Sequence, residues 1–432
     1  MVKKGRRSPK KIIEKIKKKL YSSKFMEENR VSTKDFTRKR KLPFVSLVLF
    51  MANIVKQTVQ KELTNFIRLI EGKSTNISKS AFSQSRVKLK PKAFIELNKV
   101  LVDEFYADNP LEKWRGFRLI AIDGTKVSLP TSSKELMDKF GTLSSGVIIP
   151  EAQISTCYDP LNEIIIDSQI EPIEFDERTL ALRHINLLNK NDLIILDRGY
   201  GAAWFYFYII NKEINFVNRI SKGFFKEARL FWSSKEKSKI IEVKGCPQKS
   251  RHQLEKLGME FKPFKIRLVK VILDNGGIEI LATTLLDEKK YPSNIFKELY
   301  FKRWGIETNY DHLKSNIRLE DFTGLSEIAI RQDFYASSFI INLQSIISMD
   351  AQQEMNDNKK STKHNYKINK NLSLGFMKDK IIKILMSNNP KYYEELKELF
   401  KMNPVPIRNG RKNQRIFRRS RRKYSINRKR SV

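Results

Sequence analysis

The sequence predicts an α/β protein with an all-α domain at its N-terminus. Apolar residues recur at helical spacing through roughly the first hundred residues, whereas short strand-like apolar runs begin near residue 115. Beyond that point strands and helices follow one another, which is the order of an α/β core. Two apolar runs, 264–273 and 278–286, flank Asp274-Asn275-Gly276-Gly277, and this arrangement predicts a β-hairpin.

We expect three consecutive domains in the 432 residues. The first, 1–110, begins with a basic arm and continues as helices. The second, 111–349, is the α/β core, with a β-strand insertion at about 215–287. The third, 350–432, is a helical region followed by a basic tail.

The first domain has the element order of a DNA-binding motif. A helix is expected over 55–70 with Gly72 as its stop, and a short basic helix is expected over 78–89. A helix, a glycine-containing turn and a basic helix in that order are typical of a helix-turn-helix. Arg86 and Lys88 are then candidates for DNA contact. A plain helical bundle is the alternative.

The core is expected to alternate between strands and helices. Strands are predicted over 117–122, 147–156, 163–170 and 192–196, and helices over 178–188, 202–211 and about 293–349. Glu177 and Arg178 precede one of these helices and are predicted to cap it rather than to belong to a site. The polar segment 351–372 is predicted to be a linker, and a last helical pair is expected at about 374–402.

The charge of the chain is strongly positive. Lys and Arg number 84 against 48 Asp and Glu, which gives a net charge of +36. Residues 1–20 hold ten Lys or Arg and one Glu, and residues 407–432 hold twelve and no acid, so the middle of the chain is basic as well. Nucleic acid is the partner that this charge predicts.

Neither a membrane nor an oxidising compartment is expected. The most apolar stretch, 44–55, has 12 residues, whereas a bilayer span needs about 20. Cys157 and Cys246 fit no zinc spacing and are expected to be reduced. No signal-peptide pattern is present at the N-terminus. We expect a cytoplasmic, nucleoid-associated protein of bacterial type.

Two acids follow apolar strands directly. Asp123 comes after residues 119–122 and Asp197 after residues 193–196. In open α/β sheets the ends of strands are where sites are built, although an Asp before a Gly also forms turns. Mg²⁺ prefers carboxylate oxygens, and two such ions about 4 Å apart suit displacement at phosphorus. That chemistry needs a third carboxylate.

Glu307 is the candidate for the third carboxylate. On one continuous helix, at about 100° per residue, Tyr300, Arg303, Glu307 and Lys314 project within a narrow wedge. Trp304 falls outside this wedge and is expected in the core. The alternative is an exposed ion pair between Arg303 and Glu307, which are four residues apart.

The spacing Y-x-x-R-x-x-x-E-x-x-x-x-x-x-K, from Tyr300 to Lys314, resembles the signature of the insertion sequence four family of bacterial transposases. The segments 122–125 and 196–200, around the two aspartates, resemble family motifs as well. Further similar stretches lie at 36–42, 80–86 and 403–408. The resemblance covers most of the chain and shows no departure in these motifs.

The resemblance implies a ribonuclease H-like core in which Asp123, Asp197 and Glu307 hold two Mg²⁺ or Mn²⁺ ions. It implies binding to terminal inverted repeats, hydrolysis that frees 3′-hydroxyls, and attack of these hydroxyls on target DNA. The partner is then double-stranded DNA, and we expect a homodimer when the protein is assembled on it. A repressor derived from a transposase and a nuclease on the same core are the alternatives.

Four further residues are candidates for DNA contact. By the same resemblance, Tyr300, Arg303 and Lys314 would contact phosphates near the cleaved end, as Arg, Lys and Tyr side chains can. Trp232 lies in a basic stretch of the insertion. Related transposases close the donor end as a hairpin, and an aromatic ring can stack on the base that this bend displaces. Packing within the insertion is the alternative for Trp232.

Overall fold

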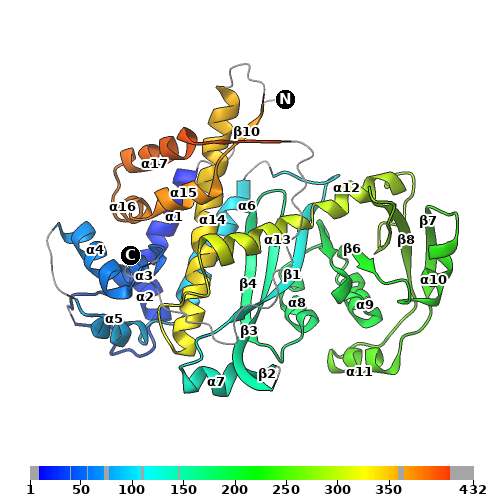
Figure 1. The fold of residues 1–432 in the computed structure, drawn as a ribbon, viewed down its shortest axis with the longest axis horizontal. Coiled ribbons are helices and arrows are strands. Elements are labelled where there is room, and N and C mark those ends of the chain that lie inside the picture. Colours follow the sequence, from blue (N-terminus) through cyan, green and yellow to red (C-terminus); the bar gives the residue numbers. More distant parts are fainter. Residues whose placement is uncertain are drawn as a thin grey trace. The chain divides into compact units, whose positions relative to one another are not determined.

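A computed structural model describes residues 9–38, 40–55, 57–72, 77–108, 111–144, 146–358 and 364–408 (Figure 1). The chain forms two compact units, each built from segments that are distant in the sequence. The helical unit comprises Met1–Pro110, Lys126–Ala152 and Tyr310–Val432, and the sheet unit comprises Leu111–Thr125 and Gln153–Asn309. The first eight residues of the predicted basic arm, and the basic tail beyond residue 408, lie outside the described residues.

The grouping of residues differs from the three consecutive domains expected from the sequence. Helices from both ends of the chain belong to one unit, because α6 and α17 both pack against the long helix α14. The helices of this unit are α1 (Pro9–Leu20), α2 (Ser23–Asn29), α3 (Phe44–Ala52), α4 (Val59–Glu71), α5 (Lys79–Arg86), α6 (Lys92–Asp108), α7 (Lys134–Phe140), η3 (His312–Asn316), α14 (Glu327–Asp357), α15 (Lys370–Met377), α16 (Lys380–Met386) and α17 (Lys391–Met402).

Short strands complete this unit. They are β2 (Gly141–Ser144), which pairs with the first residues of β3, and the pair β10 (Tyr366–Lys367) and β11 (Val405–Pro406).

Local sequence signals account for several helix boundaries. The side-chain oxygens of Ser22, Ser78 and Ser326 accept hydrogen bonds from backbone N–H groups in the first turns of α2, α5 and α14. Helix α4 ends at Gly72, whose φ of +69° lies in the left-handed region that glycine adopts without strain. The expected stop at Gly72 is thus confirmed.

Two predicted boundaries in the C-terminal region are wrong. The expected linker over 351–372 is partly helical, because α14 continues to Asp357 and α15 begins at Lys370. Instead of a helical pair, three short helices, α15 to α17, follow. The polar residues at the end of α14 misled the prediction, since a polar stretch can be a solvated helical turn as well as a loop.

The structure contradicts the prediction that Arg86 contacts DNA. Arg86 is 3% exposed, and its guanidinium donates to Asp333 (3.0 Å), to Gln332 (2.9 Å) and to Thr323 (2.7 Å). Helix α5 ends at Arg86, earlier than expected, and this residue faces α14 inside the helical unit. Arg86 is therefore a packing residue of this unit.

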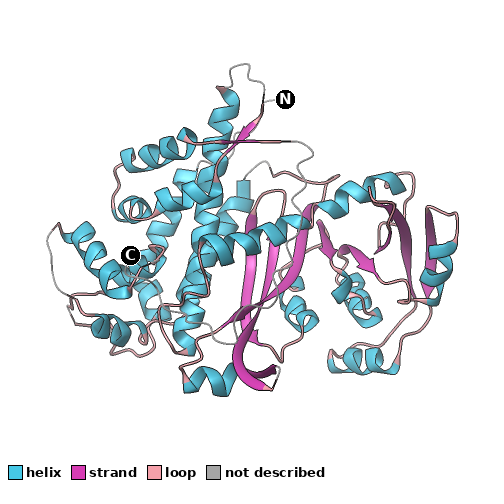
Figure 2. Ribbon diagram, in the orientation of Figure 1, coloured by secondary structure: helices cyan, strands magenta, loops and turns pink. Residues whose placement is uncertain are grey.

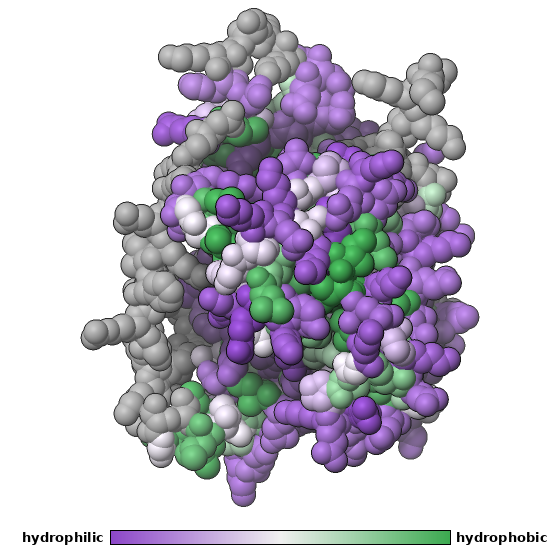
Figure 3. Space-filling view, turned by 90° about the vertical axis from the view of Figure 1, so that its right-hand side faces the viewer, coloured by the Kyte–Doolittle hydropathy of each residue, from purple (hydrophilic) through white to green (hydrophobic). Residues whose placement is uncertain are grey.

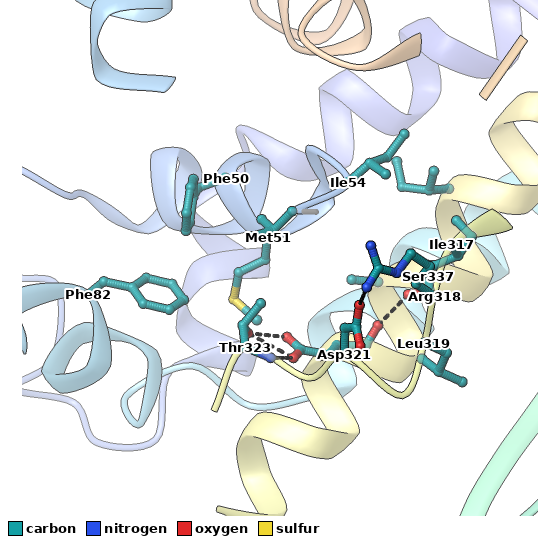
Figure 4. Close-up of a pocket in the computed structure, with 14 residues that line it drawn as sticks. Phe50, Met51, Ile54, Phe82, Ile317, Arg318, Leu319, Asp321, Thr323 and Ser337 are labelled. Carbon is teal, nitrogen blue, oxygen red and sulfur yellow. Dashed lines mark hydrogen bonds and ion pairs between the residues drawn. The ribbon is translucent and has the colours of Figure 1, made fainter. Parts of the chain in front are cut away.

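A small cavity lies close to these contacts. It measures about 40 Å³ and lies between α3, α5 and α14, with Phe50, Met51 and Phe82 among its apolar lining residues (Figure 4). Asp333, bonded to Thr323, and Asp321, paired with Arg318, lie at its edge. The cavity is far too small for a nucleotide and is not a candidate site for chemistry on DNA.

The sheet unit contains a mixed sheet with helices on both faces (Figure 2). Its strand order is β3-β1-β5-β6-β9-β8-β7, and β4 pairs with β3 beside this path. The strands are β1 (Arg118–Ser128), β3 (Val147–Asp159), β4 (Ile164–Pro172), β5 (Asp192–Leu196), β6 (Asn215–Ile220), β7 (Ser238–Val243), β8 (Phe264–Ile272) and β9 (Ile278–Thr283). The helices are α8 (Glu177–Ile185), η1 (Arg198–Tyr200), α9 (Ala203–Asn211), α10 (Lys226–Ser233), α11 (Gln248–Lys256), η2 (Ser293–Ile295), α12 (Phe296–Phe301) and α13 (Trp304–Asp311).

The central strands are parallel and are buried on both faces. Strand β5 pairs in parallel with β1 and with β6. Successive side chains of a strand point to opposite faces. Ile120, Ile122, Ile194 and Leu196 join one apolar cluster, with α8 and α9, and the residues between them, such as Leu193 and Ile195, join another, with α12. The continuous apolar sequence of β5 reflects this two-sided burial.

The predicted insertion extends the same sheet. Strand β9 pairs antiparallel with β6, and β8 and β7 follow outward from it. The expected hairpin is confirmed, with Gly276 at a φ of +80° in its turn. The face of this unit that carries β7 and α10 is largely hydrophilic, with small apolar patches (Figure 3). No helix among the described residues is long and apolar enough to cross a membrane.

We expect Arg86→Met to destabilise the protein strongly. The substitution leaves the Asp333 carboxylate without its buried partner, and breaking a buried ion pair in this way costs roughly 3–5 kcal/mol. The measurement is the free energy of unfolding from urea titrations. Lys79→Met, at an exposed position of the same helix, is the control and should change that energy by less than about 0.5 kcal/mol. Equal stability of the two variants would contradict the assignment of Arg86 as a packing residue.

Candidate active site

The register of two parallel strands brings Asp123 and Asp197 together. Ile122 of β1 and Leu196 of β5 are direct partners, and each aspartate is the next residue along its strand. By the alternation of side chains, both aspartates point to the face covered by α12. The prediction that the two acids lie on adjacent strands is therefore confirmed, although β1 continues beyond Asp123 to Ser128.

Asp197 is held by the next strand of the sheet. Leu196 and Asn218 are partners between β5 and β6, so Arg219 follows beside Asp197. The Arg219 guanidinium donates to Asp197 Oδ1 from Nη2 (2.6 Å) and from Nε (3.1 Å), and to Glu279 on β9 (2.7 Å). Sequence reasoning missed Arg219, since only the pairing of β6 with β5 places it there.

Glu307 reaches the same cluster through Arg303. The Arg303 guanidinium donates to Glu307 Oε1 (2.6 Å), and its other terminal nitrogen lies 3.6 Å from Asp123 Oδ2. Arg303 is 4% exposed, which excludes the alternative of an exposed ion pair. The Tyr300 hydroxyl lies 3.5 Å from Asp197 Oδ1. Five predicted residues, Asp123, Asp197, Tyr300, Arg303 and Glu307, thus gather in the sheet unit.

The helix that was expected to carry these residues is interrupted. Helix α12 ends at Phe301 and α13 begins at Trp304, and between them the N–H groups of Lys302 and Arg303 bond to carbonyls three residues back. The assumption of 100° per residue therefore fails at this turn. Trp304, which was expected in the core, is 46% exposed, so that prediction is wrong.

The remaining DNA-contact candidates lie in different surroundings. Lys314 belongs to the helical unit, where its ammonium donates to the carbonyl oxygen of Lys126 (2.6 Å) and burial lowers its pKa. Lys88 lies in the turn after α5, with its ammonium 3.9 Å from Asp35. Trp232 is half-buried against the apolar cluster of the sheet unit, with the Lys222 ammonium 5.7 Å from its ring centre. Their contact with DNA stays a prediction.

A fourth carboxylate lies at the site, contrary to prediction. Asp176, not Glu177, caps α8, because its side chain accepts from the N–H of Arg178. Glu177 accepts a hydrogen bond from Gln153 (3.3 Å) and lies against Gly124. Gly124 and Gly199, which follow the two aspartates, leave room for the Glu177 carboxylate. This signal was present in the sequence, but the glycines were interpreted only as turn residues.

A Ser-His-Asp arrangement, which the sequence does not reveal, lies beneath α8. His184 Nδ1 lies 2.6 Å from Asp167 Oδ2, and the Ser155 hydroxyl lies 3.1 Å from His184 Nε2. Ser155 and His184 are fully buried, so no substrate can reach the hydroxyl. The three residues instead fix α8 to β3 and β4.

Burial and neighbouring charges shift the pKa values of the acids of the site. Burial, with the neighbouring charges of Glu177 and Asp197, raises the pKa of Asp123 to about 7. Burial also raises the pKa of Glu177. For Asp197 burial acts in the same direction, but the N–H of Arg198 and the Arg219 guanidinium outweigh it and lower the pKa. Such opposed shifts are typical of functional sites.

The carboxylate oxygens of the site are suitable ligands for a hard divalent cation, although they do not converge on one point. Among the described residues, no group of three or more His, Cys, Asp or Glu is placed to hold a metal ion. The guanidinium of Arg303 lies between Glu307 and Asp123, and that of Arg219 is bound to Asp197, so arginine supplies the positive charge. Carboxylate oxygens are nevertheless the ligands that Mg²⁺ and Mn²⁺ prefer.

We expect the stability of the metal-free protein to depend on the protonation of Asp123. Because its pKa is raised to about 7, the folded protein binds this proton more tightly than the unfolded chain does. The stability that the proton contributes is present at acidic pH and is lost as pH rises toward 7. With EDTA present, urea unfolding from pH 5 to 8 should show this decrease in the wild type and a smaller one in Asp123→Asn. If the free energy of unfolding depended on pH in the same way in both proteins, the raised pKa of Asp123 would be contradicted.

Comparisons with known proteins match this chain to transposases. The transposase DDE domain family model matches residues 114–343. The transposase InsG for insertion sequence element IS4 of Escherichia coli (strain K12) is 21% identical over 297 residues, which are 66% of this chain and 65% of that protein's length.

Among solved structures, the piggyBac transposase synaptic complex with hairpin DNA is similar over 89% of this chain and 79% of that chain. The identity is 10% and the TM-score 0.43, which is too low to bear on the fold. The family model, in contrast, covers more than half of the 432 residues and includes Asp123, Asp197 and Glu307. The chain therefore belongs to the transposase DDE domain family.

Proposed function

We propose that this protein is a DNA transposase that binds the terminal inverted repeats of an insertion sequence, hydrolyses phosphodiesters at the element's ends and joins the freed 3′-hydroxyls to target DNA. The observation that carries the proposal is the convergence of Asp123, Asp197 and Glu307 in the sheet unit, within a chain of the transposase DDE domain family. The parallel pairing of β1, β5 and β6, with Asp123 in β1 and Asp197 directly after β5, also supports a ribonuclease H-like core.

Asp123, Asp197 and Glu307 are the residues that would hold the divalent ions. When bound, a pair of Mg²⁺ or Mn²⁺ ions supplies activation of the attacking oxygen and charge for the leaving oxygen. Asp123 must lose its proton to serve as a ligand, because only the ionised carboxylate binds a metal ion well. Arg219 keeps Asp197 ionised and oriented, because its guanidinium donates twice to the same oxygen.

Arg303 and Tyr300 would contact a phosphate of the DNA. Arg303 is bound to carboxylates, and its Nε has no hydrogen-bond partner among the described residues although it is buried. An oxyanion at this position would satisfy that nitrogen, and guanidinium groups bind phosphate as readily as carboxylate. The Tyr300 hydroxyl, close to Asp197, can donate to a neighbouring phosphate oxygen. Lys314 is proposed as a third phosphate contact from the family spacing alone.

Positive charge in the helical unit supports binding to the phosphate backbone. Lys88 lines a cavity of about 340 Å³ together with Lys34, Arg38 and Arg40, the last three of which are exposed. The net charge of +36 extends this attraction over the chain. Stacking of Trp232 on a displaced base, the homodimer on DNA and association with the nucleoid stay predictions.

We expect Asp123→Ala, Asp197→Ala and Glu307→Ala each to reduce strand cleavage by at least about a hundredfold, because each removes a ligand of the divalent ions that would stabilise the transition state. Binding to DNA should remain, since these acids do not contact phosphate. The substrate is a duplex carrying the DNA that flanks the gene, and cleaved strands are counted on denaturing gels in Mg²⁺. Glu174→Gln, an exposed acid of the same unit, is the control.

The same assay separates the alternatives. Cleavage within about tenfold of wild type in all three variants would refute the site. Cleavage by the wild type without joining to an added target duplex would favour the nuclease, and specific binding without cleavage would favour the repressor.

Lys88→Ala should weaken DNA binding at all sequences alike. Loss of one phosphate contact lowers the slope of log affinity against log salt by about one. The measurement is a salt titration of binding by fluorescence anisotropy with the full chain. Lys99→Ala, an exposed lysine on α6 that is paired with Asp103, is the control. An unchanged slope in Lys88→Ala would exclude this residue from the DNA contact.

A further inference from the structure

Glu177 is a carboxylate at the site that has no role in the mechanism proposed above. It is the first residue of α8, and α8 packs on the face of the sheet opposite to α12, with Ala181 and Ile185 in the apolar cluster there. Tyr300, at the other face, belongs to the cluster that includes α12. Acids from both faces of the sheet therefore meet where Asp123 of β1 lies beside the end of β5.

Two glycines make room for the Glu177 carboxylate. A Cβ atom at Gly124 would lie 2.6 Å from Glu177 Oε1, and one at Gly199 would lie 3.8 Å from Glu177 Oε2. Gly124 follows Asp123 directly, and Gly199 is two residues beyond Asp197. The carboxylate thus lies between the two segments that carry the catalytic aspartates, with one oxygen toward each. A side chain at position 124 would displace it.

Glu177 differs from the other three acids in its surroundings. Asp123 and Glu307 contact Arg303, and Asp197 is bound by Arg219. Among the described residues Glu177 takes part in no ion pair, and the hydrogen bond that it accepts comes from the neutral amide of Gln153. A half-buried carboxylate beside two others, with no cation in contact, is an arrangement that a bound cation would stabilise.

The fold holds Glu177 in this place. His184, two turns along α8, is fixed to Asp167 on β4 and to Ser155 on β3. The Arg178 guanidinium donates to the carbonyl oxygen of Gly199 (2.7 Å) and so ties the start of α8 to the segment after Asp197. Groups that bind metal ions depend on such supporting contacts for their orientation.

We propose that Glu177 is a fourth carboxylate of the active site, which helps Asp123 and Asp197 to hold a divalent cation. This inference rests on the proposed function, because it presumes that the two aspartates bind metal. It adds a ligand from α8 to a set that otherwise comes from β1, β5 and α13.

Glu177→Gln tests the proposal without a catalytic assay. The amide keeps the shape of the side chain and can still accept from Gln153, but it loses the charge. With EDTA present, the melting temperature of Glu177→Gln should equal or exceed that of wild type, because one of three neighbouring like charges is gone. A residue that mattered only for structure would lower the melting temperature instead.

The second measurement is Mn²⁺ binding to the full chain, followed by the electron paramagnetic resonance signal of free Mn²⁺. We expect Glu177→Gln to weaken binding by about tenfold or more, since even supporting residues of metal sites contribute ten- to a hundredfold. Glu174→Gln, in the segment before α8, is the matched control and should bind like wild type. Asp123→Asn is the reference for loss of an aspartate ligand.

The outcomes distinguish a failure of the role proposed for Glu177 from a failure of the proposed function. Weakened Mn²⁺ binding in both Glu177→Gln and Asp123→Asn, with Glu174→Gln unchanged, supports the proposal. Weakened binding in Asp123→Asn alone overturns the role of Glu177 and leaves the proposed function intact. Wild-type binding in Asp123→Asn as well, or no binding by the wild type, overturns the metal site itself and the proposed function with it.

Discussion

The parallel pairing of β1 with β5 is the constraint on which the candidate site depends. Because Ile122 and Leu196 are partners, the next residues, Asp123 within β1 and Asp197 directly after β5, lie side by side. A shift of the register by one residue would turn one aspartate toward the opposite face. The register is specified by burial on both faces, since four apolar residues, 119–122 in β1 and 193–196 in β5, directly precede each aspartate.

Bringing acids together in a partly buried place is unfavourable, and two arginines offset this cost. Arg219 bonds to Asp197, and Arg303 lies between Glu307 and Asp123. The two arginines thus reduce the repulsion among the acids with side chains that can also bind phosphate. Among the described residues Glu177 forms no ion pair of this kind, and the charge of the neighbouring Arg178 offsets only part of the burial and of the repulsion by Asp176 and Asp197 that raise its pKa. A site of this kind favours function over stability.

The helical unit shows why the type of a residue is a weak guide to its role. Arg86 and Lys88 are two residues apart and were both candidates for DNA contact. Arg86 is buried and bonded to α14, whereas Lys88 lies in the turn beyond the end of α5, beside a basic cavity. The arginine is fixed by partners more than 200 positions away in the sequence, such as Thr323 and Asp333. No local pattern contains that information.

The sequence by itself determined the α/β class, most helices and strands, and the candidate triad. These features depend on local periodicity, on capping and turn residues, and on a motif whose spacing is visible in one chain. The tertiary structure alone decided that α14 joins helices from both ends of the chain, that the helix before Glu307 is interrupted, and that Arg219 and Glu177 lie at the site. The physical reason is that these placements follow from strand order and from packing across sheet faces, which link residues without any fixed spacing along the chain.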